Sequence, residues 1–246
     1  MTSQPNESRI ALVTGASGYL GQVVVSDLAR SGLKCAAVYH ANADPVAALK
    51  AEFADEVLPV AADLRDPKGI EDLYDGVCQH LGHPDVLVCC AGRTLRKSAL
   101  LTDHADTRAL MTLNFDAPVA LARLCLRAML ARKWGRVVMI GSVTAAVGAP
   151  GQAAYAASKA ALATWVTSVA SEMKGDVTLN TIAPGALDDG NDDYSADERA
   201  AALQRMPRAA FGQAEDIAGL VRFLVSREAG YINGATLTAD GGGRLF

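Results

Sequence analysis

The chain has 246 residues, of which half are hydrophobic, 5% are aromatic and 22 are glycine, and its formal net charge is −4 at pH 7. This length suits one large α/β domain spanning residues 1–246, because no linker-like stretch divides the sequence. The acidic balance and the absence of a Lys/Arg run argue against nucleic acid or an anionic membrane as the main partner.

Cysteine usage and hydropathy indicate the compartment. The five cysteines, Cys35, Cys78, Cys89, Cys90 and Cys125, are odd in number and form no Cys-x-x-Cys pair. Neither a disulfide framework nor a zinc site is therefore indicated, and we expect no metal. No stretch approaches the ~18 apolar residues that span a bilayer, and the first residues lack the apolar core of a signal peptide. The sequence thus predicts a reducing compartment, the cytoplasm.

Short apolar runs alternate with longer helical patterns along the chain. The apolar runs are Ile10–Val13, Cys35–Tyr39, Val57–Ala61, Val86–Cys90, Val137–Ile140, Val177–Ile182 and Ala235–Thr238. The helical patterns lie near residues 19–31, 44–54, 67–81, 103–132, 152–173 and 213–226. Unbroken apolar character is typical of parallel strands buried on both faces. The order of elements predicts a single-domain, Rossmann-type doubly wound parallel sheet of about seven strands with helices on both faces.

A glycine-rich segment, Thr14-Gly-Ala-Ser-Gly-Tyr-Leu-Gly21, follows the first strand and opens the first helix. Its three glycines allow a tight turn and a close approach of the backbone to a ligand. The free N–H groups and the positive dipole end of the helix suit a pyrophosphate. Because a strand precedes the loop and a helix follows it, the segment predicts a dinucleotide site. The residues expected to contact the dinucleotide here are Gly15, Ser17, Gly18, Tyr19, Leu20 and Gly21.

The end of the second strand bears on the choice of dinucleotide. An NAD-specific site places an acidic residue there to hold the ribose 2′-hydroxyl. This strand instead ends in Tyr39-His40-Ala41-Asn42, and Asp44 already belongs to the next helix. No carboxylate then repels a 2′-phosphate, which Ser17, His40 and Asn42 could bond, although no Arg or Lys stands nearby. We therefore expect NADPH to be preferred over NADH.

Tyr155 and Lys159 are four residues apart on a predicted helix, and Ser142 ends an apolar run thirteen positions before Tyr155. A tyrosine hydroxyl with its ordinary pKa near ~10 is a poor proton donor at neutral pH. A lysine at i+4 lies on the same helix face, so its charge is expected to lower that pKa. The pair then suits acid catalysis on a carbonyl or base catalysis on an alcohol, with Ser142 orienting the reacting oxygen. The alternative is a half-buried tyrosine beside a solvated lysine, which the strand, small-residue loop and helix around the pair disfavour.

The segment after the sixth strand is irregular and acidic. It begins at Pro184-Gly185 and contains Asp188, Asp189, Asp192 and Asp193. Ligands bind beyond the carboxyl ends of the strands in such sheets. We therefore expect a lid at about residues 186–207, in preference to a merely solvated loop.

Together these residues resemble the short-chain dehydrogenase/reductase superfamily over nearly the whole chain. Within it, the sequence is most similar to the bacterial 3-oxoacyl-acyl-carrier-protein reductases. The likeness is carried by residues 135–142 (Gly-Arg-Val-Val-Met-Ile-Gly-Ser), 151–162 (Gly-Gln-Ala-Ala-Tyr-Ala-Ala-Ser-Lys-Ala-Ala-Leu), 179–185 and 230–242. The resemblance implies an NAD(P)-dependent oxidoreductase acting on a CH–OH or C=O group.

The resemblance also implies roles for single residues. By it Tyr155 donates the proton, Ser142 orients the carbonyl, and Asn114 holds a proton-relay water. Lys159 would both lower the tyrosine pKa and bond the nicotinamide ribose. The hydride comes from the cofactor, so the protein supplies positioning and electrostatics. The further cofactor contacts that it implies are Asp63 and Leu64 at the adenine, with Cys90, Ala91, Gly92, Pro184, Gly185 and Leu187.

The sequence departs from this subgroup in three places. The glycine spacing is TGxxGxxG instead of TGxxxGxG. Cys89-Cys90 replace an Asn-Asn pair whose amides brace the sheet and the adenosine side, and Asp188-Asp189 stand where a threonine is expected. None of these changes removes a reacting group. They indicate a specialised relative in secondary metabolism and not the housekeeping fatty-acid enzyme.

The leading functional prediction is an NADPH-dependent ketoreductase for a β-ketoacyl thioester held on acyl carrier protein or coenzyme A. It would serve fatty-acid or polyketide-like secondary metabolism. One alternative is an NAD(P)-dependent dehydrogenase of a small alcohol, sugar or steroid, since the fold does not fix the function. The other is a non-catalytic dinucleotide-binding subunit, which the intact Asn114, Ser142, Tyr155 and Lys159 disfavour.

Two predictions concern protein partners. The stretches 103–132 and 152–173 are apolar around much of their circumference, which predicts a homotetramer or dimer built on these helices. The residues in question include Ala117, Leu121, Leu124, Ala163 and Val166. A basic cluster predicts a docking patch for an acidic carrier, with an ordinary basic helix end as the alternative. Its members are Arg123, Arg127, Arg132, Lys133 and Arg136.

Overall fold

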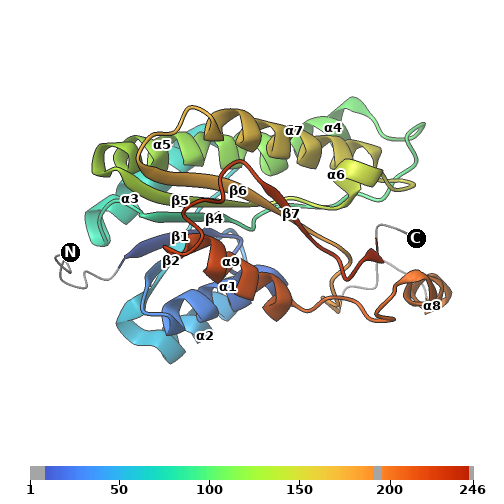
Figure 1. The fold of residues 1–246 in the computed structure, drawn as a ribbon, viewed down its shortest axis with the longest axis horizontal. Helices are drawn as coiled ribbons and strands as arrows, with labels where there is room; N and C mark the ends of the chain where they lie inside the picture. The colour runs from blue at the N-terminus through green and yellow to red at the C-terminus, as the bar shows by residue number, and fades with distance from the viewer. Residues whose placement is uncertain (1–8, 191–195, 244–246) are drawn as a thin grey trace.

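The computed structural model describes residues 9–190 and 196–243 (Figure 1). In this part of the chain, seven parallel strands form one sheet in the order β3-β2-β1-β4-β5-β6-β7. The strands are β1 (Ile10–Thr14), β2 (Lys34–Tyr39), β3 (Val57–Ala61), β4 (Val86–Cys89), β5 (Trp134–Ile140), β6 (Asp176–Pro184) and β7 (Thr236–Ala239). The predicted Rossmann-type sheet is confirmed.

Helices cover both faces of the sheet (Figure 1). One face carries α1 (Tyr19–Arg30), α2 (Asp44–Phe53) and α9 (Ala214–Val225). The other carries α3 (Pro67–His80), α5 (Ala117–Arg132) and α7 (Ala153–Ala170). Further helical segments are η1 (Ala54–Glu56), α4 (His104–Met111), η2 (Thr112–Asp116), α6 (Thr144–Val147) and α8 (Ala196–Arg205).

The strands supply apolar side chains to both layers. In β1, Ala11 and Val13 pack in the core beneath α1 and α9, whereas Leu12 packs in the core beneath α3 and α5. Successive side chains of a strand point to opposite faces, so an unbroken apolar run fills both layers at once. This packing is the physical reason why the strands could be recognised as continuous apolar runs.

The strand order reverses between β1 and β4, which lie side by side in the sheet. From this point the chain builds outward to β3 on one side and to β7 on the other. Ligands in such sheets bind in the crevice beyond the carboxyl ends of the strands at the reversal. The glycine segment follows β1 and the Cys-Cys-Ala-Gly segment follows β4, so both border this crevice.

One predicted helix, 103–132, is interrupted. It divides into α4, the π-type turn η2 and α5. Pro118 lies in the first turn of α5 and has no N–H to donate to the carbonyl of Asn114, four residues earlier. The wide turn carries the Asn114 side chain fully into the interior. The helices α6 and α8 were not predicted; α8 falls within the expected lid, of which residues 191–195 lie outside the described residues.

The helical stretch His104–Arg132, which includes the turn η2, is long and apolar enough to cross a membrane, judged by length and composition alone. Its α5 part lies on the sheet with one face buried in the core.

Ala117 and Leu121, together with Val166 of α7, point into that core and are unavailable for an interface between subunits. The prediction that these three residues form an interface between subunits is therefore wrong. Leu124 and Ala163, which belong to the same prediction, are only half-buried.

Candidate active site

The turn after β1 requires glycine at two positions. Gly15 has a φ of +70°, and a Cβ there would lie 2.7 Å from the backbone nitrogen of Ala91. A Cβ at Gly21 would lie 2.0 Å from the Gly15 carbonyl oxygen, so α1 can approach the turn only without a side chain. Gly18 caps α1 in an extended conformation, and in the described part of the chain no side-chain cap bonds the first N–H groups of the helix. These features fit a pyrophosphate at the start of α1.

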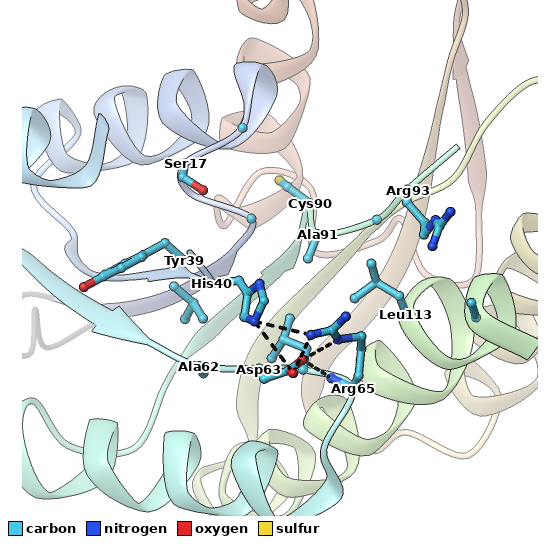
Figure 2. Close-up of a pocket in the computed structure, with 16 residues that line it drawn as sticks. Ser17, Tyr39, His40, Ala62, Asp63, Arg65, Cys90, Ala91, Arg93 and Leu113 are labelled. Atoms are coloured by element: carbon cyan, nitrogen blue, oxygen red, sulfur yellow. Dashed lines mark hydrogen bonds and ion pairs between the residues drawn. The ribbon is translucent and has the colours of Figure 1, made fainter. Parts of the chain in front are cut away.

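A cavity of about 370 Å³ lies beside this turn, between the ends of β1, β2, β3 and β4 (Figure 2). It brings together nine of the residues predicted to bind the cofactor: Gly15, Ser17, Gly18, His40, Asp63, Leu64, Cys90, Ala91 and Gly92. Tyr19 is placed differently, because its hydroxyl bonds Gln213 at 3.1 Å and accepts from the N–H of Ala214 at 3.3 Å. Its side chain therefore anchors the start of α9, and Leu20 and Gly21 likewise pack within the fold.

The ends of β2 and β3 hold a cation that the sequence analysis did not identify. The side chain of Arg65 donates to both carboxylate oxygens of Asp63, at 2.8 Å and 2.7 Å, and its Nη2 lies 3.5 Å from Nε2 of His40 (Figure 2). These hydrogen bonds hold the pKa of Asp63 well below its usual range. The prediction that no arginine stands near His40 is therefore wrong, because the pairing of β2 with β3 brings Arg65 across.

Asn114 braces the segment that follows β4. Its amide donates to the carbonyl of Arg93 at 3.0 Å and to the hydroxyl of Ser158 at 3.0 Å. Its side-chain oxygen accepts from the N–H of Arg93 at 3.0 Å. A Cβ at Gly92 would lie 3.1 Å from that oxygen, so the segment passes the buried amide closely. Asn114 thus joins η2, α7 and the loop after β4 beside the cofactor cavity.

A second cavity of about 520 Å³ contains the predicted reacting groups. Ser142, Tyr155, Gly185 and Leu187 line it, and the Ser142 hydroxyl is near enough to Tyr155 to influence its pKa. Ser142 also shares a hydrogen bond of 2.9 Å with the hydroxyl of Thr144. Pro184 lies at the end of β6, where its carbonyl accepts from the N–H of Val143 at 3.0 Å. Two hydroxyl groups therefore meet at one wall of the second cavity.

Lys159 lies deeper than Tyr155 and is buried. Its ammonium donates to the carbonyl of Ile140 at 2.7 Å and lies 6.0 Å from the centre of the Tyr155 ring. Burial raises the pKa of Tyr155, and the neighbouring Ser142 hydroxyl opposes that rise. Burial also lowers the pKa of Lys159 to about 8. The expectation that Lys159 pulls the tyrosine pKa below its ordinary value is thus wrong for this arrangement, because the ammonium is directed at a backbone carbonyl.

Charged side chains from α8 and its neighbours form the far wall of the second cavity. Arg96, in the loop after β4, pairs with Glu198 of α8 at 2.8 Å. Arg199 of α8 pairs with Asp188 at 2.7 Å and packs over the Phe211 ring. Sequence reasoning missed both arginines, since nothing in the local pattern indicated that distant segments meet here. The described part of the predicted lid therefore does border the cavity.

Two further findings concern metal ligands and the basic cluster. Among the described residues, no group of three or more His, Cys, Asp or Glu side chains could hold a metal ion. Arg136 cannot belong to the predicted basic docking patch, because it is fully buried, where it pairs with Asp176 at 2.8 Å. Arg132 pairs with Asp85 at 3.1 Å beside the starts of β4 and β5, at the edge of the sheet opposite the glycine turn.

The glycine turn, the two cavities and the hydroxyl pair define a dinucleotide-dependent oxidoreductase site. In agreement, the model of the short chain dehydrogenase family matches residues 9–199, and the chain belongs to this family. It is an NAD(P)-dependent oxidoreductase of the 3-oxoacyl-acyl-carrier-protein reductase-like kind. The predicted non-catalytic alternative is therefore set aside.

The chain is similar to several known proteins at modest sequence identity. The chain is 33% identical to 3-oxoacyl-acyl-carrier-protein reductase FabG of Escherichia coli K12, over 96% of this chain and 97% of that protein. It is 35% identical to FabG of Pseudomonas aeruginosa over the same shares. A dehydrogenase/reductase from Sinorhizobium meliloti has a similar structure, with a TM-score of 0.87 and 32% identity over 96% of this chain and 94% of that one. A putative gluconate dehydrogenase from Agrobacterium tumefaciens shares the fold, with a TM-score of 0.88 and 24% identity over 97% and 96%.

Proposed function

We propose that this protein is an NADPH-dependent ketoreductase that reduces a β-ketoacyl thioester to its 3-hydroxyacyl product. The observation that carries the proposal is that the Ser142 and Tyr155 side chains line the same cavity, the second one, with Lys159 buried beside Tyr155. The names of the relatives support the substrate class, since they reduce 3-oxoacyl groups on acyl carrier protein.

The chemistry needs a hydride at the carbonyl carbon and a proton at its oxygen. NADPH would supply the hydride when bound in the first cavity, whose glycine turn fits its pyrophosphate. Tyr155 donates the proton to the carbonyl oxygen, and Ser142 holds that oxygen by a hydrogen bond. Lys159 lies buried beside Tyr155 and would bond the nicotinamide ribose of the bound cofactor. Asn114 keeps the loop after β4 in position and supports the return of a proton to Tyr155.

The substrate would reach the second cavity as a thioester on acyl carrier protein or coenzyme A. We place the reaction in the cytoplasm, in a biosynthetic pathway for fatty acids or polyketide-like products, and propose that the protein works as a homotetramer or dimer. These assignments rest on the resemblance to carrier-dependent reductases.

A second candidate function is favoured by the charged wall of the second cavity. The pairs Arg96–Glu198 and Arg199–Asp188 offer hydrogen bonds to a polar substrate. A small polar alcohol or sugar, oxidised with NADP⁺, would suit such a wall. The same hydroxyl pair would then act in the reverse direction, with Tyr155 as the base.

One assay separates the two candidates. The purified protein is given NADPH with acetoacetyl-coenzyme A and with the same acyl group on acyl carrier protein, and given NADP⁺ with a panel of polyols and sugars. We expect a larger kcat/KM for the thioesters, and rates near zero for Tyr155→Phe in the same preparation. Turnover confined to the polar alcohols would instead establish the second function.

A further inference from the structure

We propose that Arg65, with His40 beside it, is the site that recognises the 2′-phosphate of the cofactor. The inference rests on the proposed use of NADPH and names the residue that selects it. It starts from the cation that the fold brings to the ends of β2 and β3, 25 residues from His40 along the chain. Neither residue takes part in the proton transfer described above.

Arg65 lies in the part of the first cavity where the adenosine ribose of the cofactor belongs. The pyrophosphate belongs at the glycine turn, and the reacting hydroxyls lie in the second cavity. The adenosine half then extends the other way, to the end of β2, where doubly wound folds hold the adenosine ribose. His40 is the residue at that end, and Arg65 lies against it (Figure 2). Both line the cavity and keep more than half of their side chains exposed, so a phosphate can reach them.

The hydrogen bonding of Arg65 leaves donors for a second anion. Asp63 accepts from Nε and Nη2, which fixes the plane of the guanidinium. Nη1 has no partner among the described residues. A guanidinium has five N–H donors in a rigid fork that matches phosphate oxygens, and one held in place loses little freedom on binding. Asp63 is thus a positioning residue, whose carboxylate is occupied by Arg65 instead of being free for the adenine as the resemblance implies.

The surrounding charges favour a phosphate over a 2′-hydroxyl. The NAD-type carboxylate is absent from the end of β2, and the negative charge of Asp63 at the end of β3 is offset by its ion pair with Arg65. Among the described residues, a second arginine, Arg93, lines the cavity; it lies on the β4 side, apart from His40 (Figure 2). Arg65 is therefore positioned to contact the group at the ribose 2′ position.

Binding of two nucleotide fragments tests this assignment without any turnover. Isothermal titration of the full chain compares 2′,5′-ADP with 5′-ADP, which differ only in the 2′-phosphate. We expect the wild type to prefer 2′,5′-ADP. Arg65→Gln should lower the affinity for 2′,5′-ADP by roughly tenfold or more and leave that for 5′-ADP within about twofold. Arg65→Lys should fall between, because it keeps the charge and loses the fork.

Two control variants sharpen the comparison. Arg93→Gln removes a cation from the same cavity and should not change the ratio of the two affinities. Arg30→Gln removes an exposed arginine that pairs with Glu52 on another face of the molecule, and should change neither affinity. Unchanged 5′-ADP binding also shows that each variant is folded.

The outcomes of these titrations distinguish the assignment of Arg65 from the proposed use of NADPH. If the wild type prefers 2′,5′-ADP and Arg65→Gln keeps that preference, the assignment of Arg65 is overturned while NADPH use stands. If the wild type binds both fragments equally, both the phosphate site and the NADPH preference fail. A loss of preference in Arg65→Gln alone confirms the inference.

Discussion

At the scale of single residues, the proton transfer rests on the Tyr155 hydroxyl. Replacing Tyr155 with Phe removes the acid and leaves the ring and the first cavity in place. We expect kcat to fall by ~10²–10⁴-fold, the usual contribution of a positioned acid or base. The Kd for NADPH, measured by titration, should stay near the wild-type value. A variant that kept more than about a tenth of the wild-type rate would contradict the role.

Lys159 gives a prediction about pH and stability. Its pKa falls from 10.5 to about 8 on burial. Between these values the unfolded chain binds more protons than the folded chain, so the free energy of unfolding rises with pH there. Below pH 8 the buried charge costs up to ~3 kcal/mol. The Tm of Lys159→Met minus that of the wild type, without cofactor, should therefore be more positive at pH 7 than at pH 10. An equal difference at both pH values would mean that the pKa is not lowered.

The variant His40→Asp tests whether the end of β2 determines the preference between NADPH and NADH. The new carboxylate would hold the ribose 2′-hydroxyl of NADH, repel a 2′-phosphate and compete with Asp63 for Arg65. We expect the ratio of kcat/KM for NADPH over NADH to fall by about tenfold or more. An unchanged ratio in steady-state assays would place the ribose elsewhere.

Some properties of these residues could be predicted from the sequence, and others could not. The spacing of Tyr155 and Lys159 predicted one helix face, and both lie on α7 beside Ser142. It could not predict the direction of the pKa shifts, because these depend on burial and on the Ile140 carbonyl. Arg65 was missed because only the pairing of Tyr39 with Ala61 across β2 and β3 brings it to His40.

At the scale of elements, α8 gives a prediction about the substrate. Its ion pairs with Arg96 and Asp188 are about half exposed, so each contributes under ~1 kcal/mol to stability. Removing both, in Glu198→Gln with Asp188→Asn, should leave Tm nearly unchanged and raise KM for the substrate several-fold, because the cavity wall loosens. The Kd for NADPH is the control and should not change. A raised Kd with constant KM would mean that α8 serves the cofactor instead.

The strands could be predicted from the sequence, whereas two of the helical features could not. Seven apolar runs gave seven strands, since burial on both faces leaves an unbroken apolar pattern. The break at η2 was signalled by Pro118, which the helical periodicity of 103–132 concealed. The helix α8 was missed because it is polar and lies on the substrate side, where a periodic apolar face is not needed.

At the scale of the whole molecule, the assembly remains a prediction. A groove along α3 and α5 is lined by Ala120, Leu124 and the stems of Arg123 and Arg127, all outside the buried core. Light scattering at micromolar concentration should give the mass of a tetramer or dimer, and Leu124→Glu should lower it. A monomeric mass for the wild type would contradict the assembly.

The most direct test of the central claim follows the hydride and the proton together. The protein is given a β-ketoacyl thioester on its carrier and NADPH carrying deuterium at both positions of nicotinamide C4, and the product is analysed by mass spectrometry. We predict a 3-hydroxyacyl product with one deuterium at C3, formed by the wild type and nearly absent with Tyr155→Phe. A product without deuterium, or equal yields from both proteins, would contradict the account.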